Sequence, residues 1–162
     1  MRRERRKLGG RFTGVKAGVR YTGRVKTFIG GLALILTAAL AAEVALVQPK
    51  DLAAQLAAKG ARPAIIQVGP NLLFRSHHIP GAVFAGPGSR SDGLELLKAA
   101  VKGMPRDRDI VIHCGCCPWD RCPNIQPAFA LLKQMGFTRV RAMYSALSFK
   151  SDWIDRGYPV EQ

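Results

Sequence analysis

The sequence predicts an α/β fold with a mainly parallel, five-stranded sheet and helices on both of its faces. Two observations lead to this prediction. From residue 44 onward, short apolar runs alternate with segments in which apolar residues recur at helical spacing. The runs are also dense in hydrophobic residues, which is typical of strands that are buried on both faces of a sheet.

Five of the apolar runs are interpreted as strands. The clearest reads Asp-Ile-Val-Ile-His, and another reads Ala-Ile-Ile-Gln-Val. The first run in the chain, residues 44–47, is the weakest of the five. The expected strands cover residues 44–47, 64–68, 82–85, 109–113 and 139–144.

Two helices are predicted from apolar residues that lie about one turn apart and from the glycine that follows each group. Glycine is favoured just after a helix, because it adopts the left-handed conformation of many helix ends. One helix is expected over residues 49–59, and the other precedes residue 103. The positions are Leu52 and Leu56 before Gly60, and Leu94, Leu97 and Val101 before Gly103.

Two further helices follow the fourth strand. The third is expected to begin around Pro123, because proline suits the first turn, where its missing N–H has no intrahelical partner. It is expected to end at Gly136. The fourth is expected over residues 148–156 and to end at Gly157.

Positive charge is concentrated at the N-terminus. The chain has 25 Lys and Arg against 11 Asp and Glu, a net charge of +14. Residues 1–27 carry +9 of this, leaving +5 for the rest. Hydrophobic residues make up 48% of the chain, which argues against intrinsic disorder and against a bare nucleic-acid tail. We therefore predict no nucleic-acid partner; a polybasic arm that meets nucleic acid or anionic lipid is the alternative.

An uncharged, Leu-, Ile- and Ala-rich run covers residues 28–42 and ends in Ala39-Leu40-Ala41-Ala42, which has the small-residue spacing of a signal-peptide cleavage site. Residues 1–41 are therefore predicted to be a basic signal peptide or a membrane anchor, and residues 44–161 a separate domain. If the signal is not cleaved, residues 28–47 are long enough to span a membrane. In both cases the positive-inside rule places the domain outside the cytoplasm, in the periplasm of a bacterium.

The four cysteines all lie within residues 114–122, which read Cys-Gly-Cys-Cys-Pro-Trp-Asp-Arg-Cys. Cys114 directly follows a predicted strand, and the segment leads into a helix, so the thiols are expected at the carboxyl edge of the sheet, where α/β folds bind ligands. Loop N–H groups and a helix N-terminus favour a thiolate there. Arg121 adds a full positive charge. The pattern predicts a nucleophilic cysteine that acts on an anionic substrate.

Several segments match a known family in order and spacing. Residues 78–82 read His-Ile-Pro-Gly-Ala, and residues 110–114 read Ile-Val-Ile-His-Cys. Residues 131–137 contain Leu-Leu-Lys and then Gly-Phe, and Trp153 precedes Gly-Tyr-Pro-Val at residues 157–160. Over about residues 44–161, the chain resembles the rhodanese-like sulfurtransferase domains.

The resemblance implies that the Cys114 thiolate attacks a sulfane sulfur and carries it as a persulfide to a thiol acceptor or cyanide. The backbone of Gly115, Cys116 and Cys117 would cradle the persulfide, and Arg121 would attract a small donor anion such as thiosulfate. This chemistry needs no metal and no organic cofactor.

The chain also departs from the family pattern. Its loop is about five residues longer than the standard one. In the family, four residues usually separate the catalytic cysteine from an arginine or a similar group. Here four residues separate Cys116, not Cys114, from Arg121. The nucleophile is therefore ambiguous, and placement at the strand end favours Cys114. Gln67 and Gly69 replace an acidic and a basic residue that are common in the family.

Two other functions remain open. Cys114 and Cys117 form a Cys-x-x-Cys pair after a strand, as in thiol-disulfide oxidoreductases. Metal or ligand binding without catalysis is the other, although the usual second Cys-x-x-Cys is missing. We expect His113 to be a packing residue and His78 to secure the loop. The candidate metal ligands are Cys114, Cys117 and Cys122 with one of His77, His78 and His113.

Overall fold

The computed structural model describes residues 43–162, which build a five-stranded sheet with the order β1-β5-β4-β2-β3. All four neighbouring strand pairs are parallel, so the predicted α/β class is confirmed. Each observed strand falls within its expected run. The strands are β1 (Leu46–Val47), β2 (Ala64–Gln67), β3 (Val83–Phe84), β4 (Ile110–His113) and β5 (Val140–Met143).

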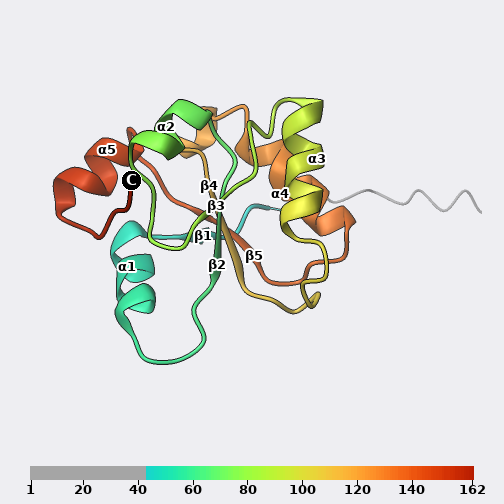
Figure 1. Ribbon diagram of the computed structural model, residues 1–162, viewed down its shortest axis with the longest axis horizontal. Helices are drawn as coiled ribbons and strands as arrows, with labels where there is room; N and C mark the ends of the chain where they lie inside the picture. The colour runs from blue at the N-terminus through green and yellow to red at the C-terminus, as the bar shows by residue number, and fades with distance from the viewer. Residues whose placement is uncertain (1–42) are drawn as a thin grey trace, which may run out of the picture. The chain divides into compact units, whose positions relative to one another are not determined.

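Helices cover both faces of the sheet (Figure 1). On one face, α1 (Pro49–Ala57) and α5 (Phe149–Asp152) pack over Ile65 and Val111. On the other face, α3 (Ser91–Ala100) and α4 (Ile125–Gln134) pack over the next residues of β2 and β4, Ile66 and Ile112. Successive side chains of a strand point to opposite faces, which explains why both strands are almost wholly apolar.

The third predicted helix begins two residues later than expected. Pro123 lies in a turn, and α4 starts at Ile125. Asn124 takes the capping position, but its side chain makes no cap hydrogen bond. Its amide donates instead to the sulfur of Cys114, in the segment of residues 114–123 between the fourth strand and this helix, which we call the cysteine loop.

The fourth predicted helix is broken into α5 and the 3₁₀ helix η2 (Ile154–Arg156). Trp153 between them has a non-helical backbone, with φ −125° and ψ −61°. Its side chain is fully buried, and its indole N–H donates to the Pro159 carbonyl at 2.8 Å. Burial of this large ring interrupts the helix.

Two short elements were not anticipated from the sequence. The helix α2 (Asn71–Ser76) follows β2, and the 3₁₀ helix η1 (Trp119–Arg121) lies inside the cysteine loop. Neither has a buried side chain. Both are too short and too exposed to produce a hydrophobic periodicity that could be recognised in the sequence.

The predicted signal peptide or anchor at residues 1–41 lies outside the described residues. Leu46 and Val47, at the end of the longer apolar stretch, belong to β1 and pair with β5. Within residues 43–162, no helix has the length and apolar character needed to cross a membrane.

Candidate active site

The cysteine loop leaves the sheet at the carboxyl end of β4, as expected for a parallel sheet. Two backbone hydrogen bonds fix it to the connection between β5 and α5. The Phe149 N–H donates to the Gly115 carbonyl at 3.1 Å, and the Trp119 N–H donates to the Ser145 carbonyl at 3.0 Å. Gly115 has φ +90°, a conformation that glycine adopts at little cost. The loop therefore has a defined path despite its length.

A glycine on the neighbouring strand exit makes room for the first cysteine. A Cβ on Gly69 would lie 2.0 Å from the carbonyl oxygen of Cys114 and 3.0 Å from its Sγ. No side chain fits there without displacing the loop. This explains why Gly69 replaces the larger residue that the family pattern led us to expect.

The loop gathers all four thiols into one cluster, which we call the thiol cluster: Cys114, Cys116, Cys117 and Cys122. Their Sγ atoms all lie within 4.8 Å of one another, and none forms a disulfide. The Sγ of Cys116 lies 3.1 Å from that of Cys114 and 3.0 Å from that of Cys117. Cys114 and Cys122 are buried, Cys117 is half-buried and Cys116 is exposed. Chemistry with an external molecule therefore starts most directly at Cys116.

A buried asparagine connects this cluster to a second loop. The amide of Asn124 donates to the Sγ of Cys114 at 3.2 Å. Its Oδ1 accepts from the backbone N–H of Ser89 at 3.0 Å and from the Ser89 hydroxyl at 2.8 Å. Sequence reasoning missed both residues; the only signal was a polar residue between Pro123 and an apolar helix.

The thiols of the cluster differ in acidity. A hydrogen bond from Cys114, helped by the backbone N–H groups of Asn124 and Ile125, lowers the pKa of Cys122 to about 5 despite its burial. The same Cys114–Cys122 hydrogen bond and burial raise the pKa of Cys114. Burial and contacts with the neighbouring thiols raise the pKa of Cys117 to about 12. The Cys114 thiol, and secondarily the backbone N–H groups at the start of α4, thus favour a thiolate on Cys122, whereas Cys114 is held in its thiol form.

A cavity of about 510 Å³, which we call the thiol cavity, opens beside the exposed thiol. Its walls come from α2, from the start of the cysteine loop and from the α5–η2 region. Apolar side chains form much of the surface, and a few polar groups and one lysine surround them. The lining residues are Leu73, Ser76, His77, Gly115, Cys116, Ser148, Phe149, Lys150 and Ile154.

The structure brings only some of the predicted substrate-binding residues to this cavity. Gly115 and Cys116 line it, and Cys117 lies next to Cys116 in the thiol cluster. Arg121 is exposed at the end of η1 and does not line this cavity. Lys150 is the cationic residue of its wall, and its Nζ is hydrogen-bonded to Asp155 at 2.5 Å.

The histidines have structural surroundings. His113 is buried against Phe149, with the two ring centroids 5.3 Å apart. Burial, and secondarily the charge of His78, lowers the pKa of His113 to about 3, so its ring is neutral near pH 7. Neither ring nitrogen has a hydrogen-bond partner among the described residues. These observations agree with a packing residue, not with a base.

His78 joins α2 to the end of the chain. Its Nδ1–H donates to the Phe74 carbonyl at 3.0 Å, and its ring stacks on Phe74 at a centroid distance of 4.1 Å. Its backbone forms an antiparallel bridge with Glu161 through two hydrogen bonds of 2.9 Å. The Glu161 carboxylate also accepts from the Gly81 N–H at 3.1 Å. His78 thus stabilises one wall of the cavity.

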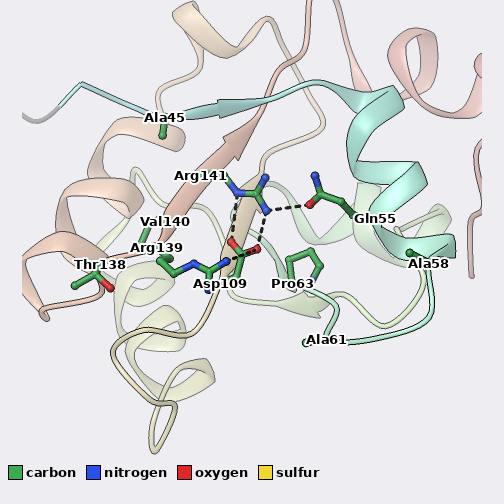
Figure 2. A pocket seen from close by; sticks show the side chains of 10 residues that line it. All are labelled: Ala45, Gln55, Ala58, Ala61, Pro63, Asp109, Thr138, Arg139, Val140 and Arg141. Carbon is green, nitrogen blue, oxygen red and sulfur yellow. Dashed lines mark hydrogen bonds and ion pairs between the residues drawn. The ribbon is translucent and has the colours of Figure 1, made fainter.

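A larger cavity, of about 640 Å³, lies at the opposite edge of the sheet (Figure 2). Its polar centre is Asp109, which accepts from Arg141 at 2.8 and 3.3 Å and lies 3.7 Å from Arg139. Arg141 also donates to Gln55 at 3.0 Å. Arg141 and Asp109 satisfy one another, and the lining includes no thiol. We therefore assign this region a structural role.

Comparisons with known proteins agree with this architecture. A crystal structure of the Alr3790 protein from Anabaena superposes with a TM-score of 0.55 at 23% identity, covering 71% of this chain and 81% of that one. The BH2092 protein of Bacillus halodurans gives 0.53 at 21% identity, covering 72% and 76%. The single-domain sulfurtransferase RDL2 of Saccharomyces cerevisiae gives 0.53 at 11% identity, covering 72% and 93%.

At these identities, the solved structures show the likeness of the fold alone. The search of curated proteins found no match. The family model of the rhodanese-like domain matches residues 48–147, which is more than half of the sequence and includes the thiol cluster. The chain therefore belongs to the rhodanese-like domain family.

Proposed function

We propose that the protein is a sulfurtransferase that moves sulfane sulfur from a small donor anion to a thiol acceptor through a cysteine persulfide in the cysteine loop. The observation that carries this proposal is the exposed thiol of Cys116, which lines the 510 Å³ cavity and contacts two further thiols. Membership of the rhodanese-like family supports it.

The reaction divides into two displacements. A cysteine thiolate attacks the outer sulfur of thiosulfate, a new S–S bond forms, and the old S–S bond breaks with its electron pair leaving on sulfite. An acceptor thiolate then attacks the outer sulfur of the persulfide and releases the protein thiolate. No net electron transfer to the protein occurs, so neither step requires an external oxidant or reductant.

Accessibility favours Cys116 for the first attack. A donor in the cavity can approach its exposed thiol, whereas Cys114 is only 4% exposed and lies among Cys116, Asn124 and the backbone near Gly69. Placement at the strand end favours Cys114, and that assignment stays a prediction. The attraction of the donor by Arg121 also stays a prediction, and Lys150 offers an alternative cation at the cavity wall.

Mass spectrometry after incubation of the reduced full chain with thiosulfate tests the proposal. We expect the loop peptide to gain one sulfur atom, and this gain to disappear in Cys116→Ser. Asp120→Asn, an exposed change in the same loop, is the matched control and should label normally. Label that survives in Cys116→Ser and is lost in Cys114→Ser would reassign the nucleophile. Absence of any sulfur gain in the wild-type chain would overturn the function.

A thiol-disulfide oxidoreductase is the second candidate, because the Cys116 sulfur lies 3.1 and 3.0 Å from two other thiols. Joining two of these thiols releases two protons and two electrons to a disulfide substrate, which becomes a dithiol. The same mass spectra separate the candidates. Loss of two hydrogens from the loop peptide after incubation with a disulfide, without a sulfur gain after thiosulfate, would favour the oxidoreductase.

We also propose that the domain works outside the cytoplasm. The support is the order of basic segment, apolar run and small residues within residues 1–42. In a Gram-negative host, the chain should appear in the periplasmic or membrane fraction, and a cleaved form should begin near Ala42. Full-length chain confined to the cytosolic fraction would contradict this proposal.

A further inference from the structure

We propose that the thiol cluster is a tetrathiolate binding site for a zinc-class metal ion. The site consists of Cys114, Cys116, Cys117 and Cys122. This inference does not rest on the proposed sulfur transfer, because it needs only the positions of the four sulfurs and of their hydrogen-bond donors. It concerns the same loop, however, and predicts a second state of that loop.

The first argument is distance. Zinc lies about 2.3 Å from thiolate sulfurs, so the edges of a regular tetrahedron of four sulfurs are about 3.8 Å long. The four Sγ atoms here all lie within 4.8 Å of one another, and two of the separations are 3.1 and 3.0 Å. The required edge of about 3.8 Å is longer than these two separations and shorter than the 4.8 Å limit. Adjustments of about an ångström would complete the tetrahedron.

The second argument is the set of N–H donors around the sulfurs. The Asn124 amide donates to the Cys114 sulfur at 3.2 Å, and the Cys116 backbone N–H also hydrogen-bonds Cys114. The backbone N–H groups of Asn124 and Ile125 hydrogen-bond Cys122. Donors of this kind orient metal ligands and disperse the charge of thiolates. They serve the two buried cysteines, which are the least able to obtain the same help from water.

The third argument concerns the ligand set. A site made of three cysteines and one histidine is disfavoured, because the histidines have other partners; the ring of His77 contacts Ser76 and Gln162. His113 packs against Phe149, and His78 stacks on Phe74 and bonds its carbonyl. The fold supplies Cys116 as the fourth ligand instead. A set made wholly of thiolates selects soft or borderline ions such as zinc over magnesium or calcium.

Binding involves no redox change. One Zn²⁺ forms four Zn–S bonds, and every thiol that is still protonated releases its proton to the solvent. The resulting centre carries a charge of −2. With all four sulfurs bound to metal, no free thiolate remains in the loop, so metal binding should protect the cysteines from alkylating reagents.

The experiment uses the reduced full chain, stripped of metal by a chelator and titrated with Zn²⁺ or Co²⁺ alone. We expect one ion per chain and protection of all four cysteines from iodoacetamide. The Co²⁺ form should show intense sulfur-to-metal charge-transfer absorption together with the strong visible bands of a tetrahedral site. Binding of less than one ion per chain, or a Co²⁺ spectrum without these bands, would overturn the proposal.

Variants add a second line of evidence. Cys122→Ser should abolish stoichiometric zinc binding, and Asn124→Ala should weaken it by about 10- to 100-fold, as is common when a partner of a metal ligand is removed. Asp120→Asn, an exposed change in the same loop, is the matched control and should bind zinc as the wild type does. Unchanged zinc affinity in Cys122→Ser would overturn the site.

The Co²⁺ spectrum comes from the wild-type chain, so the proposal stays falsifiable even where a substitution at a buried cysteine unfolds the domain. Failure of this proposal is also distinguishable from failure of sulfur transfer. Metal-free chain that gains sulfur from thiosulfate but binds no zinc refutes only the metal site. Chain that binds zinc with the expected spectrum but gains no sulfur when metal-free refutes only the sulfurtransferase.

Discussion

Asn124 links the sulfur of Cys114 to Ser89, which lies 35 residues before Asn124 in the sequence. Its Oδ1 accepts twice from Ser89, and its amide donates to the sulfur of Cys114. The residue is only 4% exposed, so water cannot replace these partners easily. A single amide therefore fixes the buried end of the thiol cluster relative to the loop between β3 and α3.

Replacing this amide should destabilise the domain. Asn124→Ala removes the buried hydrogen bond to the Cys114 sulfur and the link to the exposed Ser89, and a typical hydrogen bond contributes about 0.5 to 1.5 kcal/mol, so we expect a decrease in stability of about 1 to 2 kcal/mol. Urea denaturation should show this decrease in the free energy of unfolding. Gln126→Ala, an exposed change in the same helix, is the control and should change it by less than about 0.5 kcal/mol. Equal effects of the two substitutions would contradict the role of Asn124.

The reactive cysteines could be identified from the sequence, because all four lie in one short segment. The sequence did not show which of them an external molecule can reach. Spacing could not reveal that Cys114 is buried and Cys116 exposed, since exposure depends on how the β5–α5 connection packs on the loop. The structural role of Gly69, which the sequence shows only as a departure from the family pattern, and that of Asn124 were also not predictable. Each acts through a contact with Cys114 across the fold.

At the scale of elements, the start of α5 depends on one carboxylate. Asp152 accepts from the Ser145 hydroxyl at 2.7 Å and from the N–H groups of Leu147 and Ser148 at 2.9 and 3.1 Å. Burial raises the pKa of Asp152, but these hydrogen bonds outweigh it and hold the pKa below its ordinary value. The carboxylate thereby shapes the turn that presents Ser148 and Phe149 to the cavity.

This arrangement predicts a pH-dependent contribution to stability. Because the folded-state pKa of Asp152 is lowered, the carboxylate stabilises the fold fully above the pKa of the unfolded chain, and the contribution is lost as the pH falls through the folded value. Asp152→Asn should therefore unfold at lower urea than the wild type at pH 7, and the difference should shrink at acidic pH.

Asp51→Asn, at an exposed carboxylate in α1, is the control for this measurement. It should leave the pH dependence of the urea midpoint close to that of the wild type. A difference between Asp152→Asn and the wild type that stayed constant from neutral to acidic pH would contradict the assignment.

The long elements were predictable from the sequence, and the short ones were not. Strands such as β2 and β4, and the helix α1, have enough apolar residues in register to produce a clear period. The six-residue helix α2 has none buried, so nothing in its pattern separates it from a loop. The break at Trp153 was equally hidden, because it results from burial of one side chain and not from a helix-breaking residue.

At the scale of the whole molecule, the two larger cavities lie at opposite edges of the parallel sheet. The thiol cavity lies at its carboxyl edge, and the Asp109, Arg139 and Arg141 group lies at its amino edge, where β4 and β5 begin (Figure 2). The α/β rhythm predicted this sheet and the edge that holds the cysteines. The strand order was not predictable, because it depends on pairings between distant segments that local patterns do not encode.

The separation predicts that the two edges can be changed independently. Asp109→Asn removes the charge that faces the partly buried Arg141 and should destabilise the fold by about 1 to 3 kcal/mol. Sulfur uptake from thiosulfate per folded molecule should stay at the wild-type rate. Lys102→Ala, an exposed change, is the control for stability. Loss of sulfur uptake in a folded Asp109→Asn chain would show that the edges communicate.

The bridge between His78 and Glu161 has a practical consequence for work on this protein. The last two residues of the chain hold the segment that follows α2, and Gln162 also contacts His77 at 3.3 Å. A purification tag fused directly to Gln162 would therefore lie next to His77, which lines the cavity beside the exposed thiol, and should disturb this contact. Reactivity measurements should use material in which any such tag is separated by a flexible spacer or has been removed by a protease.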